Sequence, residues 1–168
     1  MATNTHVFTG LDGSISLAAG QGAEGTAAKT VIASYQLAPV GRATGASVQV
    51  TSDVRPFHEI GKRYASELRP GNVDVTGTIN RAYINGALLS LMLGQGAATP
   101  EPSGSFLSPA FNLTLHLSSL AFPNNSSVVT VYNLLFDTWN LALPEDDFVM
   151  ENATFKALWI AVVDKAAQ

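Results

Sequence analysis

The segment 111–118 alternates apolar and polar residues more regularly than any other part of the chain. Side chains of a β-strand point alternately to the two faces of a sheet, so this period of two predicts a strand with one buried and one polar face. The segment 73–79 has the same pattern. The first row of polar residues, at 74–80, comprises Asp74, Thr76 and Thr78 and continues to Asn80, a candidate helix cap. The second row comprises Asn112, Thr114, His116 and Ser118.

Further strands are expected at 46–51, at 128–143 as one or two strands, and at 149–163. Asp12-Gly13 follows β-prone residues and predicts an early hairpin that places Phe8 near Leu17. The total is seven or eight strands without regular βα alternation. We therefore expect a mainly β fold, a sandwich or barrel, formed by residues 1–168 as a single domain.

One helix is expected to flank the strands. Asn80 is a plausible N-cap, and Gly94 is a plausible C-terminal stop. Between them an apolar stripe has helical spacing, and it comprises Ile84, Ala87, Leu88 and Leu91. The segments 18–30 and 95–108 are rich in small residues or proline and are expected to be long loops.

The chain is poor in charge. Only 13% of its 168 residues are Asp, Glu, Lys or Arg, with a net charge of −4, whereas soluble domains average about 25%. Something other than charge must therefore cover much of the surface, such as a membrane or a large oligomer. The longest apolar run, 87–94, is far shorter than the roughly 20 residues of a spanning helix, and no signal peptide is apparent, so we expect no membrane partner.

The segment 53–69 departs from this composition. It holds seven of the 22 charged side chains, and Pro56 and Pro70 bracket most of it, which predicts a bounded loop with one helical turn near 62–68. The loop is either simply solvated or a polar docking segment for a neighbouring subunit, since mixed charges fix register and reject wrong partners. The candidate intersubunit residues are Arg55, His58, Glu59, Lys62, Arg63, Glu67 and Arg69.

No motif for catalysis or cofactor binding stands out. Residues 20–25 match G-x-G-x-x-G, but the acidic residue of a dinucleotide fold and the lysine of a phosphate loop are missing. The histidines lack zinc-site spacing, and the acidic residues at 145–151 are typical of a solvated turn. We expect no enzyme, cofactor or metal. One alternative is a small-ligand-binding β-barrel or a hydrolase that uses His58 or His116.

The order of elements resembles that of bacteriophage tail tube proteins. The matching pieces are the early hairpin, the charged loop and the alternating strand, together with two longer passages. The first passage begins at 73–77 and ends at 88–91, and the second begins at 132–137 and ends at 155–158. Related tubes occur in contractile injection and type VI secretion machines.

This resemblance implies a β-sandwich or barrel with one flanking helix. It also implies six-membered rings stacked into a tube, through which DNA and the tape-measure protein pass. The polar rows at 74–80 and 112–118 are then candidate channel linings. Further partners would be sheath or terminator proteins, with the chain in the virion tail and, during assembly, in the host cytoplasm. A tail terminator or baseplate ring of the same fold is the second alternative.

Overall fold

The computed structural model describes residues 7–38, 40–98, 104–122 and 124–165. Within them, seven strands form one antiparallel sheet in the order β1-β4-β5-β6-β3-β2, and β7 also pairs with β5. The mainly β prediction and the strand count are therefore confirmed. The strands are β1 (Gly13–Ala19), β2 (Ala43–Phe57), β3 (Glu67–Ala82), β4 (Phe111–Ser118), β5 (Ser126–Ala142), β6 (Met150–Ala157) and β7 (Trp159–Lys165).

The long strand β5 divides the sheet into two halves. Its first part pairs with β4 and β7, and its second part pairs with β6. The half-sheet of β1, β4, β7 and the first part of β5 is called sheet A. The half-sheet of β2, β3, β6 and the second part of β5 is called sheet B. The sheet does not close into a barrel.

The core lies on the inner faces of sheets A and B. Phe111 and Phe136 meet with ring centroids 4.9 Å apart, and Phe155 and Ile79 are fully buried beside them. Gly77 lies directly against this cluster. A Cβ at this position would collide with the Ser47 carbonyl oxygen and the Phe155 ring, so the close approach requires glycine.

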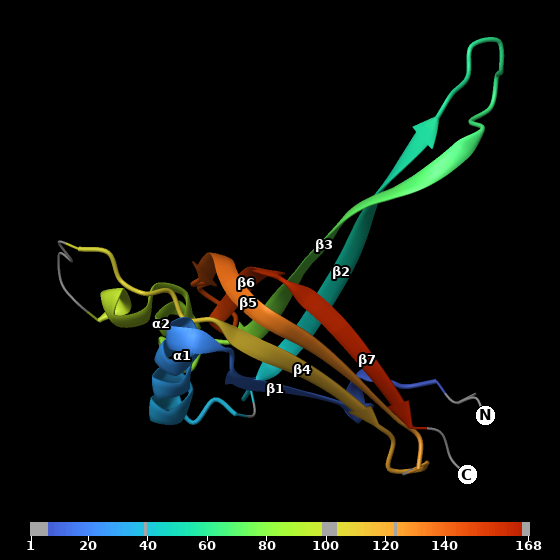
Figure 1. The fold of residues 1–168 in the computed structure, drawn as a ribbon. Coiled ribbons are helices and arrows are strands. Elements are labelled where there is room, and N and C mark those ends of the chain that lie inside the picture. The colour runs from blue at the N-terminus through green and yellow to red at the C-terminus, as the bar shows by residue number, and fades with distance from the viewer. Residues whose placement is uncertain (1–6, 39, 99–103, 123, 166–168) are drawn as a thin grey trace.

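Two helices pack together beside the end of sheet A (Figure 1). Helix α2 (Ala87–Leu93) carries three of the four residues of the predicted stripe, with Ala87, Leu88 and Leu91 fully buried, and it ends at Gly94 as expected. The fourth, Ile84, precedes the helix and is exposed, so its place in the stripe was wrong. The helix starts later than predicted because β3 continues through Asn80, which is therefore a strand residue rather than a helix cap.

Helix α1 (Gly22–Tyr35) corrects the prediction of a mobile loop at 18–30 and of a single helix. Gly25 and Ala28 are the buried residues of α1, and Val31 and Ile32 pack partly buried against the core. The first half of the helix therefore makes its contact through small residues, which give a weak apolar signal in the sequence. A Cβ on Gly25 would collide with the Gly20 carbonyl oxygen, which explains the glycine at this close approach.

The predicted early hairpin is also wrong. A 3₁₀ turn at Gly10–Asp12 precedes β1, and β1 pairs with β4 rather than with residues 7–9. The Asp12 carboxylate accepts hydrogen bonds from the Thr9 backbone N–H (2.8 Å) and hydroxyl (3.0 Å), and these bonds lower the pKa of Asp12. The predicted closing strand 149–163 bends at Leu158 and forms both β6 and β7.

Candidate intersubunit and channel surfaces

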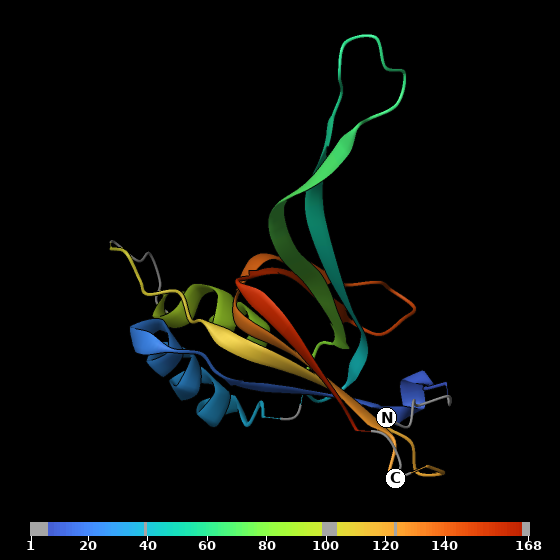
Figure 2. The ribbon, with the colours of Figure 1, turned by 45° about the vertical axis from the view of Figure 1, so that its right-hand side comes forward.

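The strands β2 and β3 extend far beyond the body of the molecule as a two-stranded arm (Figures 1 and 2). They pair with each other out to Phe57 and Glu67, whereas β6 pairs only with residues 75–82 of β3. The prediction of a loop with a helical turn at 53–69 is therefore wrong. Residues 53–57 and 67–69 are paired strand, and residues 58–66 form the tip of the arm.

One face of the arm is apolar. Val50 pairs with Val75, which is buried in the core, so the same face continues outward from the body. Along it, Val54 and Leu68 are 50% and 68% exposed. Pro56 and Pro70 also lie in the paired arm strands. An apolar sheet face without a layer packed against it is typical of a surface that another protein covers.

A β-bulge keeps this face continuous. The register of β2 and β3 shifts between Ser52 and Val54, where Gly71 lies against Asp53. A Cβ on Gly71 would collide with the Asp53 carbonyl oxygen, so only glycine allows the two strands to approach at the bulge.

The other face of the arm carries charge. Arg55 and Arg69 lie directly opposite each other, and each pairs along its own strand, with Asp53 at 2.9 Å and with Glu67 at 2.7 Å. All four side chains are more than half exposed. Exposed pairs of this kind add little stability and leave the charges available to a partner.

The tip holds the remaining predicted intersubunit residues. Lys62 Nζ lies 2.6 Å from Glu59 Oε2. The Lys62 ammonium and the Ser66 hydroxyl lower the pKa of Glu59. His58 and Arg63 also lie in the tip, and within the described residues Arg63 has no ion pair. The structure thus separates the predicted set into a paired charged face and an exposed tip.

The predicted row on β3 lies on the outer face of sheet B. Thr78 lies between Ser47 of β2 and Thr154 of β6, and the Ser47 and Thr78 hydroxyls are 2.7 Å apart. Asn80 accepts a hydrogen bond from Asn152, which lies opposite Asn140 of β5. Hydroxyl and amide side chains therefore cross all four strands.

Charges on this outer face are few. Asp74 continues the β3 row toward the arm. Lys156 and Asp137 lie on neighbouring strands, with the Lys156 Nζ and Asp137 Oδ2 atoms 3.7 Å apart. The face is therefore polar with a slight excess of negative charge.

The predicted row on β4 lies on the outer face of sheet A instead. His116 is exposed, and its neighbours across the sheet are Ser14 of β1 and Val128 of β5. Asn112 has a structural role, because its Oδ1 accepts a hydrogen bond from the Asn133 backbone N–H at 2.9 Å. Asn133 has a positive φ of 48° at a register shift in β5, so Asn112 stabilises this irregularity. The structure therefore does not bring the two polar rows together on one sheet face.

A buried polar cluster was missed by the sequence analysis, and the expectation of a solvated turn at 145–151 is wrong for Glu151, which lies buried in β6. Arg81 and Glu151 form an ion pair on the inner side of sheet B, with the two side chains 1% and 0% exposed. Glu151 Oε2 also accepts a hydrogen bond from Trp139 Nε1 at 2.8 Å. Arg81 donates to Asn85, whose Oδ1 accepts from the Ala87 backbone N–H at the start of α2 (3.1 and 3.2 Å). The pair joins positions 70 residues apart, and no local sequence signal indicates it.

Among the described residues, no three His, Asp or Glu side chains gather as metal ligands, and no helix is long and apolar enough to cross a membrane. An open groove of about 580 Å³ lies where the sheet fails to close. It is lined by Ile15, Leu115, Leu117 and Val129 with Arg42 and several small residues, and neither a histidine nor a carboxylate lines it.

Comparisons with known proteins define the class of this fold. No protein-family model matches the chain, and no curated protein matches it by sequence. Among solved structures, it is similar to a chain of the sheath/tube terminator of the PVC extracellular contractile injection system, with 10% identity, a TM-score of 0.66, and 96% of this chain and 99% of that chain covered. A chain of the PVC sheath–tube complex gives 10% identity and a TM-score of 0.63, with 95% and 93% covered.

The SPP1 tail tube is also similar, with 9% identity, a TM-score of 0.53, and 96% of this chain and 80% of that chain covered. The chain therefore has the fold of tail tube and tube terminator proteins. The sequence resemblance and the structure agree on this class.

Proposed function

We propose that this chain is a tail tube subunit that assembles into stacked hexameric rings around a channel. Its role is structural rather than catalytic. The tail-tube fold supports this proposal, and the uncovered apolar face of the arm is the single observation that carries it. Val54 and Leu68 continue the core-facing side of sheet B into solvent, and a second copy provides the missing layer.

The two ends of sheet B support closure into a ring. Within the described residues, β2 pairs only with β3, and residues 135–142 of β5 pair only with β6. Each edge therefore presents unpaired backbone N–H and C=O groups. A head-to-tail contact between the two edges, repeated around an axis, satisfies these groups and closes the ring. The same contact removes surface from water and accounts for the low charge of the chain.

In this arrangement the outer face of sheet B lines the channel. Thr76, Thr78 and Asn80 then face the lumen together with their neighbours on β2, β5 and β6. Phosphate groups bind proteins chiefly through Lys and Arg. Lys156 lies beside Asp137, whose carboxylate offsets its positive charge, and the rest of this face is polar with few other charges. Nucleic acid and an extended tape-measure protein can therefore slide along it without being held.

The arm connects one ring to the next in this proposal. Reversing charge at the tip and on the charged face, with Arg63→Glu and Arg69→Glu, should impair stacking more than folding. Both side chains are exposed, so the melting temperature should stay close to that of the wild type. The measurements are the particle size distribution and thermal melting of the same preparations.

Electron microscopy of the purified protein, and of the virion tail that contains it, tests the proposal directly. We expect hollow tubes or rings with sixfold symmetry, formed by subunits that accumulate in the host cytoplasm before assembly. A particle that stays monomeric at high concentration, together with a tail whose tube contains another chain, would refute it.

A tube terminator is the second candidate function. The observation that favours it is the similarity to the PVC sheath/tube terminator, whose TM-score of 0.66 is close to the 0.63 of the sheath–tube complex. Copy number separates the candidates, because a tube subunit forms many rings per tail and a terminator forms one. A baseplate ring is distinguished in the same way.

A further inference from the structure

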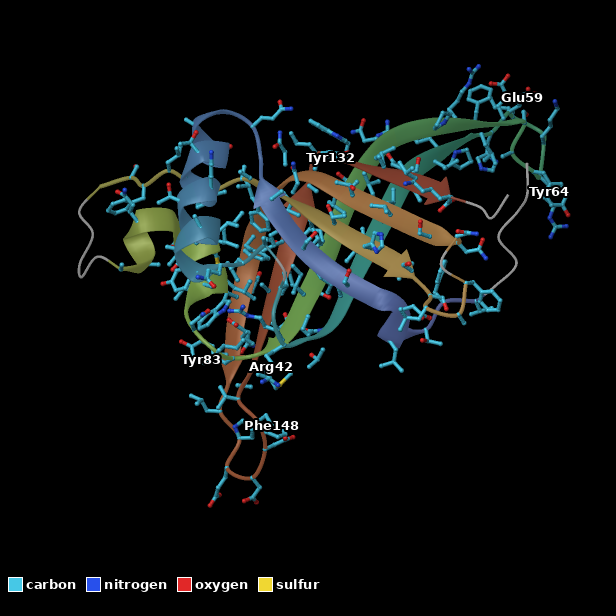
Figure 3. The ribbon with its side chains drawn as sticks, turned by 90° about the horizontal axis from the view of Figure 1, so that it is seen from below. Arg42, Glu59, Tyr64, Tyr83, Tyr132 and Phe148 are labelled. Carbon is cyan, nitrogen blue, oxygen red and sulfur yellow. The ribbon has the colours of Figure 1, made fainter. Side chains whose placement is uncertain are left out.

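An exposed apolar surface lies at the end of the body opposite the arm (Figure 3). Three segments far apart in sequence meet there: the start of β2, the turn after β3 and the β5–β6 loop. The Ala82 backbone N–H donates to the Arg42 carbonyl oxygen at 3.1 Å, and the Tyr83 backbone N–H donates to the Val149 carbonyl oxygen at 2.8 Å. These bonds hold the segments together as one surface.

This surface, formed by Arg42, residues 82–84 and residues 143–149, is called the base platform. Its large apolar side chains are strongly exposed, with Phe148 at 79% and Leu143 at 75%. Tyr83 and Ile84 extend the same surface at 40% and 54%. Clustered exposed aromatic and aliphatic residues on a charge-poor chain are typical of protein–protein contacts.

The base platform also carries negative charge. Glu145, Asp146 and Asp147 lie in the β5–β6 loop between Leu143 and Phe148, and all three are exposed. Asp147 accepts a hydrogen bond from the Phe148 backbone N–H at 2.7 Å. Within the described part of the chain, none of the three carboxylates has an ion pair. The surface therefore suits a partner that offers apolar side chains and positive charge.

The tip of the arm has these complementary properties. Tyr64 is 80% exposed and Ile60 is fully exposed, and Phe57, the last strand residue before the tip, is 56% exposed. Arg63 lies beside Tyr64 and is unpaired among the described residues, whereas the charges of Lys62 and Glu59 offset each other. The tip thus presents aromatic and aliphatic groups around a free guanidinium, a combination enriched in the centres of protein interfaces.

The tip and the base platform of one copy cannot meet. The 15 residues of β2 that separate them span roughly 45 Å at about 3.3 Å per residue. We infer that the tip of one copy docks on the base platform of a second copy. The contact uses different surfaces on the two partners, so it repeats from copy to copy along the arm direction. This inference rests on the proposed function and names the receiving surface for the arm.

Disulfide trapping tests the contact, and the chain is suitable because it contains no cysteine. The double variant with Tyr64→Cys and Phe148→Cys is assembled and oxidised, then separated on a non-reducing denaturing gel. We expect a ladder of covalent trimers and longer chains, because each subunit then carries both halves of the bond. Each single variant should give dimers at most, and Tyr64→Cys combined with Leu120→Cys serves as the matched control.

Charge exchange provides a second measurement that does not depend on cysteine geometry. Arg63→Asp should slow assembly at least about tenfold at low salt, and adding Asp146→Arg should restore it. Adding Glu24→Arg instead, in the first turn of α1, should not restore it. If the wild type forms tubes but neither the ladder nor the specific rescue appears, the base platform is not the receiver. If the wild type forms no tubes or rings, the proposed function itself fails.

Discussion

Replacing Leu68 with serine tests whether the apolar face of the arm is an interface. Fully burying a leucine side chain contributes roughly 1.5–3 kcal/mol. Leu68 is 68% exposed in the isolated subunit, so a neighbour that covers it recovers about 1–2 kcal/mol. Leu68→Ser should therefore weaken each arm contact about 5- to 30-fold. In a ring of six arms the losses add to about 6–12 kcal/mol, enough to prevent stacking at concentrations where the wild type assembles.

The subunit itself should hardly be affected. Because Leu68 lies outside the core, its substitution should change the free energy of unfolding by no more than about 0.5 kcal/mol. Sedimentation measures assembly, and thermal melting of the dissociated subunit measures folding. Leu120→Ser, at a 99% exposed position on another loop, is the matched control and should change neither. The reasoning is refuted if Leu68→Ser assembles like the wild type, or if it melts as early as a core variant.

Three further predictions concern single residues. Glu151→Ala leaves the buried Arg81 guanidinium without its partner, so the free energy of unfolding measured with denaturant should fall by about 3–5 kcal/mol. Glu145→Ala on the surface should change it by less than about 0.5 kcal/mol. The folded pKa of Glu59 is lowered, so its contribution to the tip is present above the ordinary glutamate pKa of 4.5 and is lost as the pH falls through the lowered value. Amide exchange in the tip should therefore accelerate on acidification, and Glu59→Gln should abolish that dependence. Asn112→Ala should destabilise by about 1–3 kcal/mol because it leaves the backbone N–H of the β5 bulge unpaired, whereas His116→Ala on the same row should leave the melting temperature unchanged.

Local patterns predicted the elements that have one buried face. The alternation at 111–118 matches β4, and the stripe of Ala87, Leu88 and Leu91 matches the buried face of α2. In both cases large apolar residues mark most of the core-facing positions, such as Phe111 and Leu113 in β4 and Leu88 and Leu91 in α2. The first half of helix α1 lacks that mark, because Gly25 and Ala28 make its buried contact and larger apolar residues, Val31 and Ile32, follow only in the second half. The high helix propensity of alanine was the available signal, and the neighbouring glycines obscured it.

The arm was misread for a related reason. Its charges and prolines are typical of loops, and prolines are excluded from central strands. Both arm strands are edges beyond Val75, where a proline without a backbone N–H is tolerated and charged side chains meet only water. A sequence does not state how many neighbours a strand has, so it did not distinguish a charged loop from a charged projecting hairpin.

The sequence by itself determined which segments alternate as strands and which apolar residues have the spacing of a helix. It also determined that the chain has too few charges to cover the surface of an isolated subunit. Those properties depend on near neighbours and on composition. Only the tertiary structure decided that the polar rows of β3 and β4 face outward from different half-sheets, that Arg81 meets Glu151, and that an apolar strip extends past the body without a covering layer. These facts depend on strand order and register across dozens of residues, and the side-chain pattern of one segment carries no information about which distant segment pairs with it.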